Sequence, residues 1–139
     1  MQSLVCGMKV GHIISKREDY IMTQVAVIHT AFEDTPQTVA FVDVPELPTT
    51  MEALEYAYRW TNNVMGSWSI KKPTLNFGDG EETNGDYNEN VTVMTSLTTD
   101  ENGKEWGLRS TSVGDQMLIG NQKYVVAGFG FKTIDGKDV

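Results

Sequence analysis

Residues 49–66 read TTMEALEYAYRWTNNVMG and carry the clearest helix signal in the chain. Thr49 stands three residues before Glu52, which is the spacing of a capping box at a helix N-terminus. Gly66 stands where a helix often ends in a left-handed residue. We predict a helix over 50–65 that packs one stripe of side chains on a sheet. The stripe recurs at three- and four-residue spacing and consists of Met51, Leu54, Ala57, Tyr58, Thr61, Val64 and Met65.

The segments on either side of this helix have the composition of β-strands. They are rich in β-branched and aromatic residues and are separated by turn residues. Asn102-Gly103 and Gly120-Asn121 are typical of tight hairpin turns. We expect an α+β fold, with one antiparallel sheet and a single main helix packed across one face. The predicted strands cover 9–15, 20–30, 38–44, 91–97, 104–109, 116–119, 122–127 and 129–134, with a further short candidate at 67–70.

The length of 139 residues indicates a single domain over 1–139. Residues 1–7 are expected to fray as a leader. The acidic, glycine-containing stretch 71–90 is expected to form a surface loop. Gly128 and Gly130 flank Phe129 and predict a bulge or a close approach of another backbone. Exposed aromatic rings often mark interfaces, so this segment also predicts a homo-oligomer.

The composition excludes several classes of function. Eleven Lys and Arg stand against nineteen Asp and Glu, a net charge of −8, which opposes general binding to DNA or RNA. The longest apolar run is far shorter than the roughly 20 residues that cross a bilayer, and no secretory signal is visible. A single cysteine, Cys6, excludes an internal disulfide. We therefore expect a cytoplasmic protein that binds neither nucleic acid nor membrane.

No constellation of catalytic or metal-binding residues is evident in the sequence. His12 and His29 are the only histidines, and neither has other ligand residues at metal-binding spacing. No glycine-flanked serine marks a nucleophile, and neither Gly-x-Gly segment continues as a phosphate-binding fingerprint. The acidic segment 79–86 lacks the EF-hand spacing of Gly and Glu. We expect no enzyme activity, no cofactor and no metal.

Arg109 opens the most suggestive polar segment, Arg109-Ser110-Thr111-Ser112-Val113-Gly114-Asp115. Only Arg17 and Arg59 are further arginines, and a guanidinium grips phosphate at two points. Hydroxyls and backbone N–H groups beside Arg109 could complete a phosphate cradle. The alternative is an ordinary polar connection that turns at Gly114-Asp115, and the sequence leaves both interpretations open.

A second candidate lies at the end of the predicted helix. Trp60 and Trp68 flank Asn62 and Asn63, and two indole rings with two amides could stack on and hydrogen-bond a purine. Stacking of a base on an aromatic side chain contributes about 1–3 kcal/mol. The alternative is that these tryptophans pack in the core or against the helix end.

Two segments resemble a known family of small phage and prophage proteins. They are 55–63 with 66–69, and 107–115 followed by 124–126 and 128–131. They are similar to the anti-Thoeris sponges. Members of that family are not enzymes; they bind and hide the cyclic ADP-ribose isomer made by a bacterial TIR-domain defence protein, and some also hold cyclic oligonucleotides. They are homo-oligomers with ligand sites between subunits.

The resemblance implies a phage-encoded, non-catalytic sponge that sequesters a cyclic nucleotide immune signal in the cytoplasm of an infected bacterium. The expected ligand-binding residues are Arg109, Ser110, Thr111, Asp115, Arg59, Asn62, Asn63 and Trp68. Two alternatives stay open. One is an acidic phage protein that inhibits a host protein by direct contact, and the other is a small nucleotide-processing enzyme.

Overall fold

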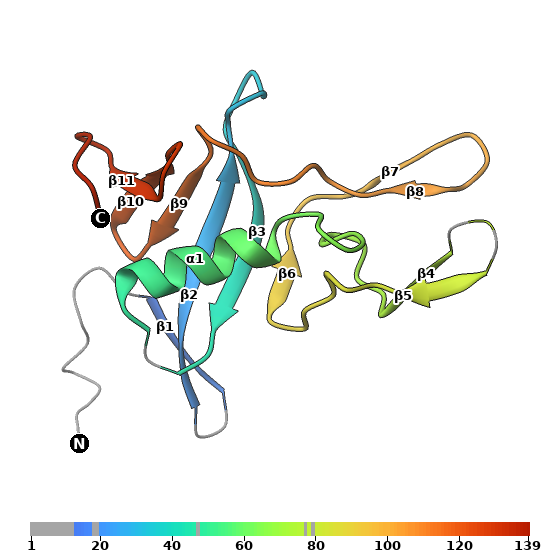
Figure 1. Ribbon diagram of the computed structural model, residues 1–139, viewed down its shortest axis with the longest axis horizontal. Coiled ribbons are helices and arrows are strands. Elements are labelled where there is room, and N and C mark those ends of the chain that lie inside the picture. The colour runs from blue at the N-terminus through green and yellow to red at the C-terminus, as the bar shows by residue number, and fades with distance from the viewer. Residues whose placement is uncertain (1–12, 18–19, 47, 77, 79) are drawn as a thin grey trace.

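The computed structural model describes residues 13–17, 20–46, 48–76, 78 and 80–139, and the side chains of 13–22 are not described. Seven strands form one antiparallel sheet in the order β11-β10-β9-β2-β3-β6, with β1 also paired to β2. Helix α1 lies across the sheet (Figure 1). The predicted α+β class is therefore confirmed. The sheet consists of β1 (Ile13–Arg17), β2 (Tyr20–His29), β3 (Gln37–Val44), β6 (Val91–Val93), β9 (Gln116–Ile119), β10 (Gln122–Val126) and β11 (Phe131–Thr133).

Strand β2 is the centre of this sheet. It pairs with β3 along one edge, while β1 and β9 share the other edge. The β2–β3 register shifts between Val27 and Ile28, so the strand bends where the loop to β3 begins. That bend precedes His29 and the loop that carries the polar cluster described below.

The core lies between one face of the sheet and α1 (Thr50–Trp60). Val25 of β2 and Val42 of β3 are cross-strand partners, and both are fully buried beneath the helix, where Leu54 and Ala57 are also fully buried. Period-2 alternation in the strands and a 3.6-residue stripe on the helix bring these residues together. The capping box at Thr49 and Glu52 is present, as predicted.

The helix is shorter than predicted and ends at Trp60 rather than Met65. The hydroxyl of Thr61 donates to the Ala57 carbonyl at 2.7 Å, and the amide of Asn62 donates to the Tyr58 carbonyl at 2.6 Å. Side chains thus satisfy carbonyls that further helical turns would have used. Val64, placed in the buried stripe by the sequence pattern, is instead 62% exposed.

Two further hairpins extend beside the main sheet (Figure 1). Strands β7 (Thr98–Thr99) and β8 (Glu105–Trp106) form a hairpin around Asn102-Gly103. Its first strand follows the predicted strand 91–97, whose first three residues form β6 and pair with β3 instead. Strands β4 (Thr74–Asn76) and β5 (Glu81–Thr83) pair within the stretch 71–90. The stretch expected to be a surface loop thus contains a short hairpin whose strands are mostly exposed, and 67–70 contains bends rather than a strand.

The C-terminal strands agree with the sequence pattern more closely. Gly120-Asn121 joins β9 to β10, as predicted. Gly130 has a positive φ of 66°, and the carbonyl of Gly130 accepts from the Ala127 N–H at 3.0 Å. The glycines therefore form a turn between β10 and β11 rather than a bulge. The predicted strand 9–15 and the leader 1–7 begin outside the described residues.

Candidate functional site

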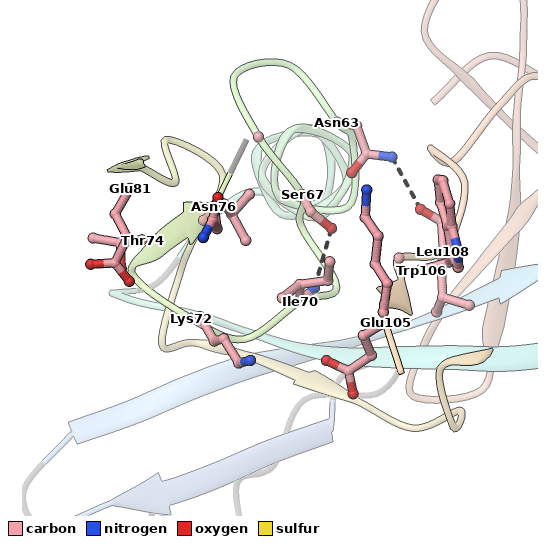
Figure 2. A pocket seen from close by; sticks show the side chains of 14 residues that line it. Asn63, Ser67, Ile70, Lys72, Thr74, Asn76, Glu81, Glu105, Trp106 and Leu108 are labelled. Atoms are coloured by element: carbon pink, nitrogen blue, oxygen red, sulfur yellow. Dashed lines mark hydrogen bonds between the residues drawn. The ribbon is translucent and has the colours of Figure 1, made fainter. Parts of the chain in front are cut away.

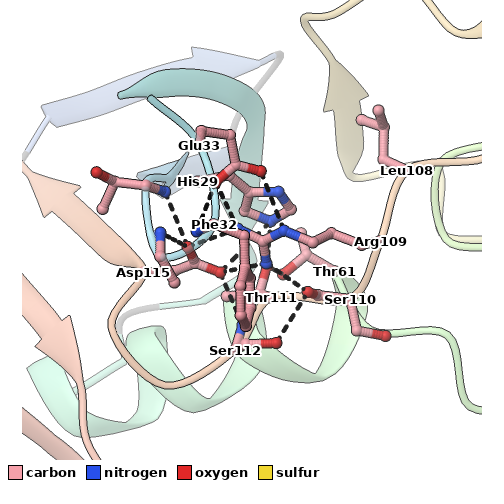
Figure 3. A network of polar contacts seen from close by, with 12 residues as sticks. His29, Phe32, Glu33, Thr61, Leu108, Arg109, Ser110, Thr111, Ser112 and Asp115 are labelled. Carbon is pink, nitrogen blue, oxygen red and sulfur yellow. Dashed lines mark hydrogen bonds and ion pairs between the residues drawn. The ribbon is translucent and has the colours of Figure 1, made fainter. Parts of the chain in front are cut away.

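Arg109 is held by two carboxylates of its own chain (Figure 3). Its Nε and Nη2 donate to the two Glu33 oxygens at 3.0 and 2.8 Å, and Nη1 and Nη2 donate to the two Asp115 oxygens at 2.7 and 2.8 Å. Nη1 also donates to the Ser110 carbonyl at 2.9 Å. A guanidinium has five N–H donors, and these five bonds use all of them. Phe32 covers the guanidinium, with its ring centroid 4.9 Å from Cζ.

Asp115 is completely buried and accepts from the backbone as well as from Arg109. Its Oδ1 accepts from the N–H groups of Thr30 and Ala31, each at 2.9 Å, and its Oδ2 accepts from the Ser112 N–H at 2.8 Å. Burial raises the pKa of Asp115, but these hydrogen bonds outweigh it and hold the pKa well below its usual range. Asp115 therefore fixes the loop after β2 onto the 109–115 segment as a carboxylate.

This cluster has the donor set that the sequence suggested for a phosphate, one Arg with converging backbone N–H groups. In the structure, the anion that these donors bind is the carboxylate of Asp115. A ligand phosphate at Arg109 would have to displace Glu33 or Asp115 from bonds of 2.7–3.0 Å. Ser110 and Thr111 are also occupied: the Ser110 hydroxyl accepts from the Asn63 N–H at 2.8 Å, and Thr111 is buried.

His29 connects this cluster to the helix end through a chain of hydroxyls. Thr61 Oγ1 donates to a carbonyl, so it can only accept from Thr111 Oγ1, which lies 2.9 Å away. The proton of Thr111 is then used, and His29 Nε2, 3.0 Å from Thr111 Oγ1, must be the donor. Burial first, and then the charge of Arg109, lower the pKa of His29. The lowered pKa favours the neutral imidazole at pH 7, and the hydrogen bonds place its proton on Nε2.

A second buried carboxylate fixes the chain just after α1. Asp86 Oδ2 accepts from the N–H groups of Val64 and Met65 at 2.8 and 2.9 Å, and Oδ1 accepts from Arg59 at 3.2 Å. Arg59 also lies 4.1 Å from the Trp60 ring centroid. Arg59 thus serves the fold, and the acidic stretch contains a structural anchor that composition alone did not reveal.

The remaining predicted residues near the helix end are also tied into the fold. The Asn63 side chain donates to the Leu108 carbonyl at 3.0 Å and accepts from the Trp68 N–H at 3.0 Å. Trp68 is completely buried, and its Nε1 donates to the Arg109 carbonyl at 2.9 Å. The structure therefore brings the two predicted clusters together through hydrogen bonds within the chain, with Trp68 buried and Asn63 at the surface.

An open cleft of about 490 Å³ lies between the two hairpins (Figure 2). Trp106 lies in its wall and is 53% exposed, and Lys104 Nζ lies 4.7 Å from the Trp106 ring centroid. Asn63 is the single predicted site residue among those that line it. The lining residues are Asn63, Gly66, Ser67, Ile70, Lys72, Thr74, Leu75, Asn76, Glu81, Lys104, Glu105, Trp106, Gly107 and Leu108.

The wall that holds Trp106 is fixed by a close approach of two chain segments. A Cβ at Gly107 would lie 2.5 Å from Ser67 Oγ, so only glycine fits there without a shift. The next N–H, of Leu108, donates to Ser69 Oγ at 2.6 Å. Sequence reasoning missed Trp106 because it concentrated on the residues that follow Gly107. The sequence signal that could have identified Trp106 was its alternation with Lys104 just after the Asn102-Gly103 turn.

No group of three or more His, Cys, Asp or Glu in the described part of the chain could hold a metal ion. Within that part, no helix is long and apolar enough to cross a membrane. Comparisons with protein family models, curated proteins and solved structures gave no match for this chain.

Proposed function

We propose that this protein is a non-catalytic binding protein that sequesters a small nucleotide signal in the cleft between its hairpins. The ligand class follows the resemblance to anti-Thoeris sponges, with a cyclic ADP-ribose isomer as the first candidate. The setting proposed is the cytoplasm of an infected bacterium, where loss of the signal would block an antiphage defence. The observation that carries the proposal is the exposed Trp106 ring in a cleft that also contains lysines.

The size and lining of the cleft support a ligand of this class. A volume of about 490 Å³ lies within the range of roughly 300–1,000 Å³ that is usual for small-molecule sites. The Trp106 ring offers a stacking surface for a base. Lys72 and Lys104 can hold phosphate, while Glu81 and Glu105 can accept hydrogen bonds from ribose hydroxyls or amines. A nucleotide carries all of these groups.

Buried polar side chains fix the chain segments that form the cleft walls. Asp86 and Asn84 fix the segment that follows α1, and Asn84 Oδ1 accepts from the Ser67 N–H at 3.0 Å. Asn63 joins that segment to Leu108. Asn63, which the sequence suggested for ligand contact, therefore helps to hold the cleft wall, and these fixed segments favour a preformed site.

Calorimetric titration with the cyclic ADP-ribose isomer produced by a TIR-domain enzyme tests this function. We expect binding by the wild-type protein and recovery of unchanged ligand after heat release, read by mass spectrometry. Lys104→Ala should weaken binding, while Lys137→Ala should not, because Lys137 is exposed and does not line the cleft. A hydrolysed product would instead support the alternative of a nucleotide-processing enzyme.

Inhibition of a host protein by surface contact is a second candidate, which one observation favours. Phe32 is 74% exposed in the loop after β2, although Asp115 and Arg109 hold that loop firmly. A rigid exposed ring is typical of an interface anchor. If this candidate is correct, Phe32→Ser should abolish inhibition of the defence protein in a purified system, and nucleotide titration should show no heat.

A further inference from the structure

The sequence contains two Asn-Gly pairs, Asn84-Gly85 and Asn102-Gly103. This dipeptide is chemically reactive, because the backbone nitrogen of the glycine can reach the side-chain carbonyl carbon, Cγ, of the asparagine. Glycine has no Cβ that would obstruct the approach. The reaction requires the asparagine side chain to rotate and the glycine nitrogen to be free, and the fold treats the two pairs differently in both respects.

The side chain of Asn84 is fixed in the interior. It is 3% exposed, its Nδ2 donates to three backbone carbonyls at 2.9–3.2 Å, and its Oδ1 accepts from the N–H groups of Ser67 and Asp86 at 3.0 and 3.2 Å. The N–H of Gly85 donates to the Met65 carbonyl at 3.2 Å, and a Cβ at Gly85 would lie 2.8 Å from Met65 Cβ. Asn84 could therefore attain the reactive geometry only by breaking this network.

Asn102 lies in the exposed turn of the β7–β8 hairpin (Figure 1). Within the described part of the chain its side chain makes no hydrogen bond, and a Cβ at Gly103 would meet no atom within 4 Å. The Gly103 N–H donates to the Asp100 carbonyl at 3.0 Å, but β7 and β8 are two residues long and pair only with each other. Because an isolated two-stranded hairpin is only marginally stable, this turn should open often.

We propose that Asn102 is a site of spontaneous covalent modification, and that the fold protects Asn84 from the same reaction. The Gly103 nitrogen bonds to Cγ of Asn102 and loses its proton, while the bond from Cγ to the side-chain nitrogen breaks and ammonia leaves. Water then opens the resulting succinimide ring at either carbonyl. The product has aspartate at position 102, or isoaspartate, in which the main chain passes through the former side chain. Water is the only co-reactant.

Isoaspartate at position 102 should release the ring of Trp106. Asp100 Oδ1 accepts from the N–H groups of Asn102 and Lys104, each at 2.9 Å, and Oδ2 accepts from Trp106 Nε1 at 3.2 Å. One extra methylene in the main chain alters the spacing of these donors, and the new carboxylate adds a negative charge beside Asp100. The effect on ligand binding rests on the proposed function, whereas the reactivity of Asn102 does not.

Peptide mapping by mass spectrometry, after incubation at 37 °C in water enriched in heavy oxygen, tests the modification. We expect residue 102 to lose ammonia and take up the label, faster at pH 8.5 than at pH 6, because the attacking nitrogen must lose its proton. Asn84 should stay unmodified in the folded protein and react in guanidinium chloride. Asn102→Gln is the matched control and should take up no label at this position. Equal conversion of Asn84 and Asn102 in the folded protein, or no label at residue 102, would overturn the proposal.

Calorimetric titration of the same samples with the cyclic ADP-ribose isomer measures the consequence for the cleft. Fully modified protein should bind at least fivefold more weakly than fresh protein. Asn102→Asp, which has the new charge without the extra methylene, should lie between them. Equal affinity of modified and fresh protein would overturn the effect on the cleft. No binding by the fresh protein would contradict the proposed function, while the label at residue 102 would still decide the modification.

Discussion

Arg109 and Asp115 form a two-point ion pair, with Nη1 to Oδ2 at 2.7 Å and Nη2 to Oδ1 at 2.8 Å. Asp115 is completely buried, while Arg109 is 27% exposed. The pair lies six residues apart in sequence, but its bonds reach Glu33 and the loop after β2. It therefore joins two distant segments and fills an anion site with a carboxylate of the same chain.

Loss of Arg109 should destabilise the fold. Arg109→Ala would leave Asp115 as a buried charge without its cation, which costs about 3–5 kcal/mol in comparable pairs. Arg109→Lys should restore part of this, because an ammonium cannot make the two-point contact. Urea denaturation measures the change. An Arg109→Ala protein as stable as wild type would show that the pair does not support the fold.

Stability should decrease as the pH falls through the ordinary pKa of histidine. His29 has a lowered pKa in the fold, caused first by burial and then by Arg109, whereas the unfolded chain binds its proton near 6.5. The unfolded state thus gains the proton first, which lowers the free energy of unfolding by up to about 1.4 kcal/mol per pH unit below that value.

His29→Gln provides the comparison, because a glutamine amide can still donate to Thr111 but does not titrate. Urea denaturation at pH 8, 7, 6 and 5 should give a shallower dependence for this variant than for wild type. The same slope in both proteins would mean that His29 is not the titrating group.

Leu54 and Val64 test the helix boundary, since the sequence pattern places both in one buried stripe. Leu54 is fully buried, so Leu54→Ala should cost about 2–5 kcal/mol. Val64 lies beyond the helix and is 62% exposed, so Val64→Ala should change stability by roughly 0.5 kcal/mol or less. Thermal melting of both variants measures the two losses of stability. A similar loss in both would support the longer helix that the sequence pattern predicts.

Gly66→Ala should be poorly tolerated although Gly66 is not a helix cap. A Cβ at Gly66 would lie 2.1 Å from Asn84 Oδ1, and that oxygen accepts from the N–H groups of Ser67 and Asp86. Displacing Asn84 should cost about 1–3 kcal/mol. Gly128→Ala is the control, because its Cβ meets no neighbour within 4 Å. Equal stability of the two variants by chemical denaturation would refute the contact.

The fold class followed from the sequence because local signals agreed with one another. The capping box at Thr49 and the Gly120-Asn121 turn each specify geometry within a few residues, and both are present. The end of the helix could not be predicted in the same way, because the side chains of Thr61 and Asn62 bind its last carbonyls in place of backbone N–H groups. Such competition depends on side-chain hydrogen bonds that periodicity does not report.

The candidate site was harder to predict than the fold. The sequence identified an anion-binding donor set around Arg109, but Glu33 lies 76 residues away and only the folded chain brings it there. Asp86 was hidden in a run of acidic residues, although it is buried. Trp106 became a candidate only when the structure placed two separate hairpins on either side of a cleft. Each case depends on contacts distant in sequence.

Calorimetric titration of wild type and Trp106→Ala with the cyclic ADP-ribose isomer tests the central claim, that the cleft beside Trp106 holds a nucleotide. Trp106 is half exposed in a short hairpin, so its replacement should leave the melting temperature nearly unchanged. Loss of about 1–3 kcal/mol of stacking predicts binding that is roughly five- to hundredfold weaker. Equal affinity in the two folded proteins, or no binding by the wild type, would contradict the account.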